Sequence, residues 1–249
     1  MHSRSGIILR GIPDRRLIGD GKMNEKAVIV VVKNPEPGKV KRRLIPILGS
    51  EGSAYLYSAF IKDILSSLRE MEPDLLISCY PPEKYQDLTE IVGDERLFPQ
   101  RGKDLGERLY NSLRYVFDMG YEKVLIICSD CPDLPPEYVN RAFSSLDDHH
   151  SVLGPAEDGG YYLIGFRKGS LVRSAFIEIP MSTPMVAEMT LSRLNEEGQK
   201  TAVIDRWRDV DLPRDLFSLK SKYKDGSGPT HTMKALEELL GGEDINSPE

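Results

Sequence analysis

The chain has 249 residues, of which 40% are hydrophobic and 29% are charged, and its formal net charge is −6. This length and composition fit one α/β domain with a sizeable core. The acidic balance argues against nucleic acid or an anionic membrane as a partner, and no apolar run approaches the roughly 18 residues that span a bilayer. The three cysteines, Cys79, Cys128 and Cys131, make no disulfide framework, so we expect a reduced, cytoplasmic protein.

The N-terminal segment has neither a periodic pattern nor the apolar core of a signal peptide, because Arg10 interrupts the short run Gly6–Leu9. We therefore predict a flexible leader over residues 1–24. A single domain is expected over residues 25–241, since no Pro/Gly/Ser-rich linker divides it. A flexible tail is expected over residues 242–249.

Strands and helices are predicted to alternate through the first half of this domain. The β-branched run Ala27–Val32 predicts a parallel strand that is covered on both faces. A helix is expected to begin with Ser50 as its N-cap and to end near Met71. Further along, the pattern predicts strands at Asp74–Tyr80, Leu97-Phe98 and Lys123–Cys128, and helices at Glu83–Val92, at Asp104–Met119 and from Pro136.

The alternation changes after a strand expected at Ser151–Leu153, because the next strand, Tyr161–Phe166, follows through a glycine-rich turn without a helix. A helix at Pro184–Gly198, a strand at Ala202–Ile204 and a helical C-terminal segment complete the pattern. It predicts an α/β fold with three layers, α/β/α, around a mostly parallel mixed sheet. In such folds ligands bind at the carboxyl ends of strands, so the loops after the first, fourth and fifth strands are candidate site segments.

The loop after the first strand combines a Pro-Gly turn with cations. Phosphate binding requires backbone N–H groups near the ligand and basic side chains, and both are available here. A solvated basic loop is the alternative, and in either case we expect Lys41 and Arg43 to be exposed. Neither a Walker loop nor a GxGxxG motif is present. The turn contains Pro37 and Gly38, and the cations are Lys33, Lys39, Lys41, Arg42 and Arg43.

Two carboxylates, Asp130 and Asp133, follow the fourth predicted strand. Mg²⁺ and Mn²⁺ bind oxygen ligands and often take only one or two carboxylates from the protein. Asp133 could instead cap the following helix. Cys128 and Cys131 form a CxxC pair, but the neighbouring carboxylates disfavour a reactive thiolate, and no second pair completes a zinc site.

The segment Gly154–Gly165 places Glu157 and Asp158 before two adjacent glycines, in a turn that lets a ligand approach the backbone. A plain hairpin explains Asp158-Gly159, but it does not explain the crowding of acids and tyrosines.

Late in the chain, Asp209 and Asp211 are spaced so that an extended loop points both carboxylates to one side. A metal ligand here could face Asp130 across the cleft, although Asp211 could also be a helix N-cap.

Taken in order, these segments resemble the radical-SAM/selenodomain-associated transferases, an uncharacterised group of the glycosyltransferase-A superfamily. The match runs from Ala27 to Leu216. Arg42 stands where threonine is usual, and Met181 stands where tryptophan often precedes Ser-Thr-Pro. The motifs that carry the resemblance are Lys33–Leu44, Gln100–Arg108, Asp130–Leu134, Gly154–Gly165, Ser182-Thr183-Pro184 and Asp209–Leu216.

The resemblance implies a catalytic domain with a nucleotide-diphospho-sugar transferase fold, in which Asp130 is the metal-binding aspartate. From its position after a strand, we expect Asp211 to be the second ligand of the same divalent cation, Mg²⁺ or Mn²⁺. Catalytic roles are expected for Asp130, Glu157 and Asp158. Phosphate contacts are expected from Lys33, Pro37, Gly38, Lys39, Lys41, Arg43, Gln100 and Asp104. Acceptor contacts are expected from Gly159, Gly160, Tyr161, Ser182 and Thr183.

Three functions are compatible with these residues. The leading hypothesis is glycosyl transfer from a nucleoside-diphosphate sugar to a small-molecule acceptor, with a cation neutralising the leaving diphosphate. The alternative is nucleotidyl transfer from a nucleoside triphosphate, since the chain also resembles cytidylyl- and guanylyltransferases of cofactor synthesis. A non-catalytic nucleotide-binding protein is the third. No nucleic-acid or membrane partner is expected, and a homodimer is compatible with the sequence.

Overall fold

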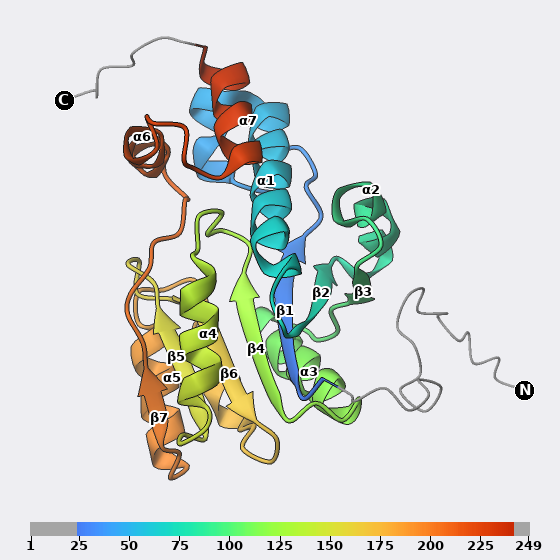
Figure 1. Ribbon diagram of the computed structural model, residues 1–249, viewed down its shortest axis with the longest axis vertical. Helices are drawn as coiled ribbons and strands as arrows, with labels where there is room; N and C mark the ends of the chain where they lie inside the picture. Colours follow the sequence, from blue (N-terminus) through green and yellow to red (C-terminus); the bar gives the residue numbers. More distant parts are fainter. Residues whose placement is uncertain (1–23, 242–249) are drawn as a thin grey trace, which may run out of the picture.

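The computed structural model describes residues 24–241, so the predicted tail and all of the predicted leader except Asn24 lie outside the described residues. A mixed sheet of seven strands forms the centre (Figure 1), with the strand order β3-β2-β1-β4-β6-β5-β7. Only β6 runs antiparallel to its neighbours in this described part. The strands are β1 (Lys26–Lys33), β2 (Asp74–Tyr80), β3 (Arg96–Pro99), β4 (Lys123–Cys128), β5 (Ser151–Pro155), β6 (Tyr161–Arg167) and β7 (Thr201–Val203).

Helices cover both faces of the sheet, which confirms the predicted α/β class. Successive side chains of a strand point to opposite faces, so Val28 and Val30 of β1 pack on the side of α1 and α4, whereas Ala27 and Ile29 pack on the side of α3 and α5. The helices are α1 (Ile45–Arg69), α2 (Thr89–Val92), α3 (Leu105–Asp118), α4 (Pro136–Ser145), α5 (Val186–Glu196), α6 (Pro213–Lys222) and α7 (Thr230–Leu240).

Two of the predicted helices differ from the observed ones by more than a residue or two at an end. The first helix begins at Ile45, not Ser50, and is interrupted at Gly49, whose φ of 69° is outside the helical range. The segment expected as one helix over Glu83–Val92 is a 3-10 turn, Pro82–Leu88, followed by the short α2. In both places local backbone geometry, which periodicity does not report, sets the boundary.

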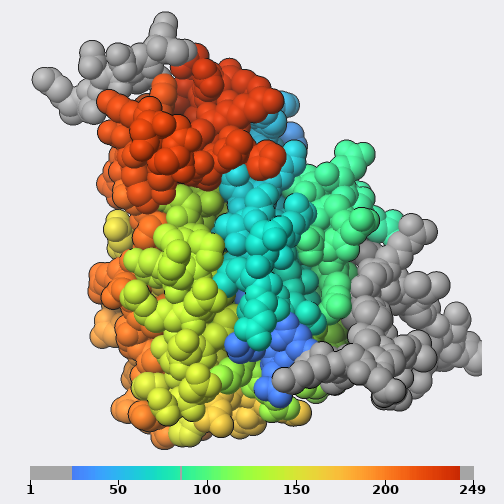
Figure 2. All heavy atoms as spheres, in the orientation of Figure 1, coloured from blue at the N-terminus to red at the C-terminus, as the bar shows by residue number. Residues whose placement is uncertain are grey.

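The C-terminal helices return to the N-terminal half of the chain (Figures 1 and 2), where α7 packs on α1. Asp63, a buried carboxylate of α1, accepts hydrogen bonds from the backbone N–H groups of His231 (2.9 Å) and Thr232 (2.6 Å). These N–H groups belong to the first turn of α7, where backbone donors have no acceptor within their own helix. No helix of residues 24–241 combines the length and apolarity that crossing a bilayer requires.

Candidate active site

The two aspartates predicted as partners, Asp130 and Asp211, lie side by side. Asp130 follows β4, Asp211 precedes α6, and Lys41 joins them. The Lys41 Nζ is 2.6 Å from Asp130 Oδ1 and 2.7 Å from Asp211 Oδ1. The two carboxylate oxygens are therefore at most the sum of these distances, 5.3 Å, apart. The structure thus brings both side chains to one position, as the sequence predicted.

Lys41 is buried, with 3% of its side chain exposed, so the prediction of an exposed cation was wrong. Its Nζ also donates to Val210 O (2.8 Å) and lies 5.3 Å from the centre of the Phe60 ring. The left-handed backbone of Lys41 (φ 42°) starts a 3-10 turn, and the side chain reaches the carboxylates from there. Burial opposes the charge, but the two carboxylates outweigh it and raise the pKa of Lys41 above its ordinary value.

Arg43 remains exposed, as predicted, with 68% of its side chain accessible. Its nearest approach to Asp211 is 3.9 Å, which is at the limit of an ion pair. Arg43 therefore borders the aspartate pair without being part of a tight contact.

Two more carboxylates, Asp158 and Asp209, adjoin the pair. Burial raises the pKa of Asp209 to about 7, with further contributions from the charges of Asp158 and Asp211. The charges of Asp209 and Asp211 act on each other, and both carboxylates are affected by Lys41, so the structure places the two carboxylates near one another. We call Asp130, Asp158, Asp209 and Asp211 the carboxylate cluster. Sequence reasoning used Asp209 only for this spacing and did not assign it to the site.

Backbone hydrogen bonds hold the Asp209 segment against the site. The backbone N–H of Trp207 donates to Pro155 O, and the Trp207 carbonyl oxygen accepts from Glu157 N. Val210 N donates to Asp130 O at 3.0 Å. Residues 207–210 therefore run as an extension of the sheet, between β5 and the loop after β4.

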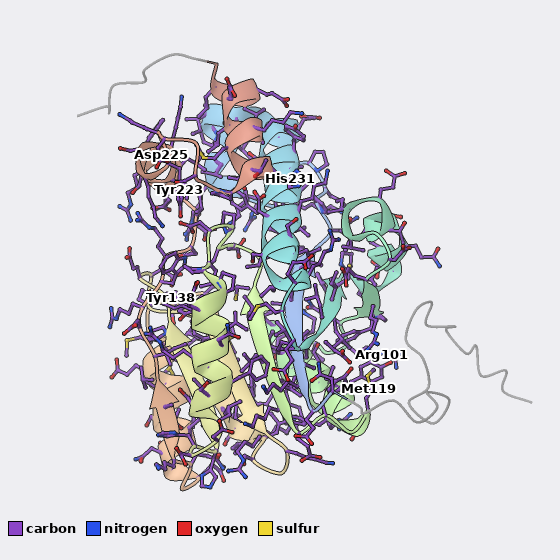
Figure 3. The ribbon with its side chains drawn as sticks, viewed as in Figure 1. Arg101, Met119, Tyr138, Tyr223, Asp225 and His231 are labelled. Carbon is purple, nitrogen blue, oxygen red and sulfur yellow. The ribbon has the colours of Figure 1, made fainter. Side chains whose placement is uncertain are left out.

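Asp133 anchors the same segment and is not the cap of α4, so that alternative was wrong. Pro135 occupies the N-cap position. The Asp133 carboxylate, with 1% of its side chain exposed, accepts from Trp207 Nε1 (3.2 Å), Lys222 Nζ (2.8 Å) and Tyr223 OH (3.1 Å). Figure 3 shows Tyr223 on the C-terminal segment that this contact ties to the loop after β4.

The neighbouring helix α6 is capped by Asp215, whose carboxylate accepts from the N–H groups of Asp211 (3.0 Å) and Leu212 (2.7 Å). Leu212 is the N-cap residue, so Asp211 does not cap this helix. The Asp211 carboxylate therefore pairs with Lys41 and lies near Asp209.

The β5–β6 hairpin brings the predicted acceptor residues together. Gly159 has φ +90°, and a Cβ there would lie 2.1 Å from Pro184 O, so only glycine allows this contact. Its carbonyl accepts from Ala187 N at 2.9 Å, which places the predicted segment Ser182-Thr183-Pro184 against the turn. Glu157 and Asp158 are exposed. Tyr161 differs from expectation, because its hydroxyl is buried in the core and finds no hydrogen-bond partner among the residues that the structure describes.

Cations gather at the ends of β1 and β2. Burial lowers the pKa of Lys33, and the nearby charges of Arg42, Arg108 and Lys39 lower it further. The Lys33 Nζ donates to Lys39 O (2.8 Å), and Lys39 pairs with Glu36 (3.0 Å). We call Lys33, Lys39, Arg42 and Arg108 the cation cluster. Arg108 was part of a quoted motif but was not predicted as a site residue.

The remaining predicted phosphate residues shape this region. Gln100 is buried and donates from Nε2 to Ser78 O (2.9 Å), which ties the segment after β3 to β2. Asp104 caps α3, as predicted, by accepting from Glu107 N (2.8 Å). Gly38 has φ +76° and open space around its Cβ position, and Pro37 precedes it in the turn.

The two cysteines beside Asp130 are poorly suited to thiolate chemistry. Burial, and then nearby negative charge, raises the pKa of both Cys128 and Cys131 above the ordinary thiol value. This agrees with the sequence argument against redox or zinc chemistry.

The aspartate pair offers carboxylate oxygens of the kind that a divalent cation binds. In residues 24–241 no group of three or more His, Cys, Asp or Glu side chains is arranged to hold a metal. Mg²⁺ and Mn²⁺ nevertheless bind through one or two carboxylates when water and substrate phosphates supply the other oxygens. Asp130 and Asp211 already converge on one cationic group, the Lys41 ammonium, and remain 40% and 37% exposed. The donor set fits such a cation.

Solved structures define the class of this fold. A Desulfovibrio desulfuricans G20 protein, provisionally assigned as a nucleotide-diphospho-sugar transferase, is 35% identical, with a TM-score of 0.82, and the match covers 87% of this chain and 95% of that chain. A cytidylyltransferase from Leptospira borgpetersenii is 12% identical (TM-score 0.55, 90% and 100% covered). The inositol-1-phosphate CTP transferase from T. maritima is 17% identical (TM-score 0.52, 87% and 98% covered). The protein has the α/β fold of the nucleotide-diphospho-sugar transferases.

Within that class, the chain belongs to the family described as "Uncharacterized protein conserved in bacteria (DUF2064)". The family model matches residues 66–183, a span that includes Arg108, Asp130 and the β5–β6 hairpin. No curated protein matches the chain. The family and fold confirm the superfamily resemblance drawn from the motifs.

Proposed function

We propose that this protein is a transferase that uses a nucleotide-activated donor, and that it moves a glycosyl group from a nucleoside-diphosphate sugar to an acceptor that carries no phosphate. One observation carries the proposal. The two charged clusters are separated along the same edge of the sheet, with cations beyond β1 and β2 and carboxylates beyond β4 and the hairpin.

The cation cluster suits the donor. A diphosphate carries several negative charges, and the repulsion among Lys33, Arg42 and Arg108 is relieved when an anion lies between them. Gly38 leaves the backbone of the loop open to a ligand. A divalent cation on Asp130 and Asp211 would supply charge neutralisation at the leaving diphosphate.

The exposed carboxylates of the β5–β6 hairpin suit an acceptor without phosphate. Asp158 and Glu157 are exposed beside Gly159 and Gly160, where the acceptor is expected. Carboxylates repel a phosphorylated acceptor, whereas they accept hydrogen bonds from a hydroxyl group and can take up its proton. Glu157 and Asp158 are therefore proposed to orient and deprotonate the acceptor hydroxyl.

Nucleotidyl transfer is the second candidate. It is favoured by the number of cations in the cation cluster, since a triphosphate carries more charge than a diphosphate. The proteins named as a cytidylyltransferase and a CTP transferase share the fold, which makes a nucleoside triphosphate a reasonable donor to test.

Product analysis separates the two candidates. Nucleotide sugars and nucleoside triphosphates, each with and without Mn²⁺, are first screened for thermal stabilisation, because a ligand at a hundred times its Kd adds about 2.7 kcal/mol. Binders are then incubated with pooled small hydroxyl compounds or sugar phosphates. Release of a nucleoside diphosphate from a nucleotide sugar is expected, and it should disappear in Asp130→Asn. Pyrophosphate release from a triphosphate would support the second candidate instead, and no nucleotide binding would contradict both.

A further inference from the structure

Arg108 is a charged residue whose surroundings in the fold do not balance its charge. It lies in the first turns of α3, and its guanidinium carbon is 4.1 Å from the centre of the Tyr80 ring. Tyr80 ends β2 and is the register partner of Lys33 at the end of β1. Arg108 therefore lies over the same strand ends as Lys33, which is an exposed cation.

The backbone around Arg108 is tightly built. A Cβ at Gly102 (φ +149°) would lie 2.7 Å from Arg108 N, and a Cβ at Gly106 would lie 2.0 Å from Phe176 O. The Asp104 cap fixes the start of the helix. With the helix start set by these contacts and the guanidinium lying on the Tyr80 ring, the side chain has little freedom to relocate.

The guanidinium of the half-buried Arg108 lacks the carboxylate partners that other arginines of this fold have. In residues 24–241, Arg108 forms no ion pair, and its Nε is buried without a hydrogen-bond acceptor. By contrast, Arg69 pairs with Glu95 at 2.7 Å and Arg96 pairs with Asp74 at 2.9 Å. A buried donor without an acceptor costs free energy. An anionic ligand with several oxygens would offset this cost at Arg108 Nε and would also balance the charge of the neighbouring Lys33.

We propose that Arg108 and Lys33 bind a phosphate group of the donor, with Tyr80 as the platform that holds the guanidinium in place. The fork of an arginine matches the oxygens of a phosphate. This assignment rests on the proposed function, because it takes the phosphate to be part of a nucleotide. It also replaces two of the phosphate contacts expected from the sequence, because Lys41 pairs with Asp130 and Asp211, and Arg43 lies beside that pair.

The donor's phosphate chain then extends in a definite direction. One phosphate lies near the aspartate pair after β4, and the other lies toward Arg108 across the end of β1, which is the strand between β2 and β4. A donor with two phosphates can therefore engage Arg108 with one of them and the aspartate side with the other.

Binding of inorganic pyrophosphate, measured by calorimetry at low salt with EDTA, tests this assignment without relying on metal or turnover. Wild-type protein should bind pyrophosphate, and Arg108→Gln should weaken binding about 10-fold or more, as expected for loss of a charge-assisted contact. Arg108→Lys keeps the charge but loses the fork, so its loss should be smaller. Arg101→Gln, an exposed arginine outside the cluster (Figure 3), is the matched control and should change binding by less than about 2-fold.

Tyr80→Leu tests the platform separately and should weaken pyrophosphate binding by a smaller factor than Arg108→Gln. Equal binding by wild type and a folded Arg108→Gln, or no binding by wild type, would overturn the assignment. If Arg108→Gln does not fold, Arg108→Lys and Tyr80→Leu decide. Arg108-dependent pyrophosphate binding without any transfer from a nucleotide would leave this assignment standing and remove the proposed function.

Discussion

The two charged clusters lie at one edge of the same sheet and differ in how their charge is balanced. The carboxylate cluster has a counter-ion supplied by the fold, the buried ammonium of Lys41. Among residues 24–241, the only ion pair of the cation cluster is that between Lys39 and Glu36. A cluster with a built-in counter-ion keeps its shape without ligand, whereas like charges without one gain stability when an anion binds. The comparison indicates that folding preorganises the acidic side and that ligand binding completes the basic side.

Removal of the built-in counter-ion is the most severe test of this difference. Lys41→Met keeps the length of the side chain and leaves Asp130 and Asp211 facing each other. The free energy of unfolding should fall by about 2–3 kcal/mol, somewhat less than for a fully buried pair, since both carboxylates are partly exposed. Urea denaturation at pH 7 with EDTA measures the change. Lys39→Met, which breaks only the exposed pair with Glu36, should cost less than about 1 kcal/mol, and equal effects of the two variants would contradict the comparison.

The acidic side should also leave a signature in the pH dependence of stability. The pKa of Asp209 is about 7 in the fold and near 4 in the unfolded chain, so the fold binds more protons between these values. The free energy of unfolding should therefore fall as pH rises from 4 to 7. Asp209→Asn cannot ionise, so it should be more stable than wild type above pH 7 by about 1–2 kcal/mol after solvent screening, and nearly equal at pH 4.

Asp225 provides a control of opposite sign for that experiment. It is exposed (Figure 3), and hydrogen bonds from Ser227 lower the pKa of its carboxyl. Asp225 therefore adds to the free energy of unfolding above the ordinary pKa of an aspartate, and this contribution is lost as pH falls. Asp225→Asn should therefore show no gain in stability at high pH. Parallel pH profiles for wild type and Asp209→Asn would show that Asp209 titrates as an ordinary carboxyl.

The smallest effect is expected at the border of the two clusters. Arg43→Gln removes a cation that is 68% exposed and 3.9 Å from Asp211. The free energy of unfolding should change by less than about 0.5 kcal/mol. Metal-free pyrophosphate binding should also change little, because Arg108 and Lys33 carry it. A loss as large as that of Arg108→Gln would place Arg43 in the phosphate site after all.

The fold was predictable because its signals are local. Buried β-branched runs such as Ala27–Val32 and the cap at Asp104 each report on their own segment. Lys41 was misplaced because its neighbours in sequence are also basic, and only the fold separates the buried cation from the exposed ones. Asp133 was misread because its partners, Trp207, Lys222 and Tyr223, are 74 to 90 residues away.

The aspartate pair and the hairpin were recognised from sequence because their motifs are compact and follow strands. Arg108 was passed over for a different reason. Within residues 24–241 Arg108 forms no ion pair and its Nε has no hydrogen-bond acceptor, and a single sequence reports neither fact.

The long reach of the Lys41 contact has a consequence for synthesis on the ribosome. Lys41 and Asp211 are 170 residues apart, and the contact between Asp63 and Thr232 spans 169. At ~5–20 residues per second, translation of the intervening chain takes on the order of 10–30 s. During that interval Lys41 and Asp130 have no Asp211, and α1 has no α7 to pack against. A nascent chain can thus form β1 to β4 early, but it acquires the paired aspartates, and with them a complete donor site, only after its last helices have left the exit tunnel.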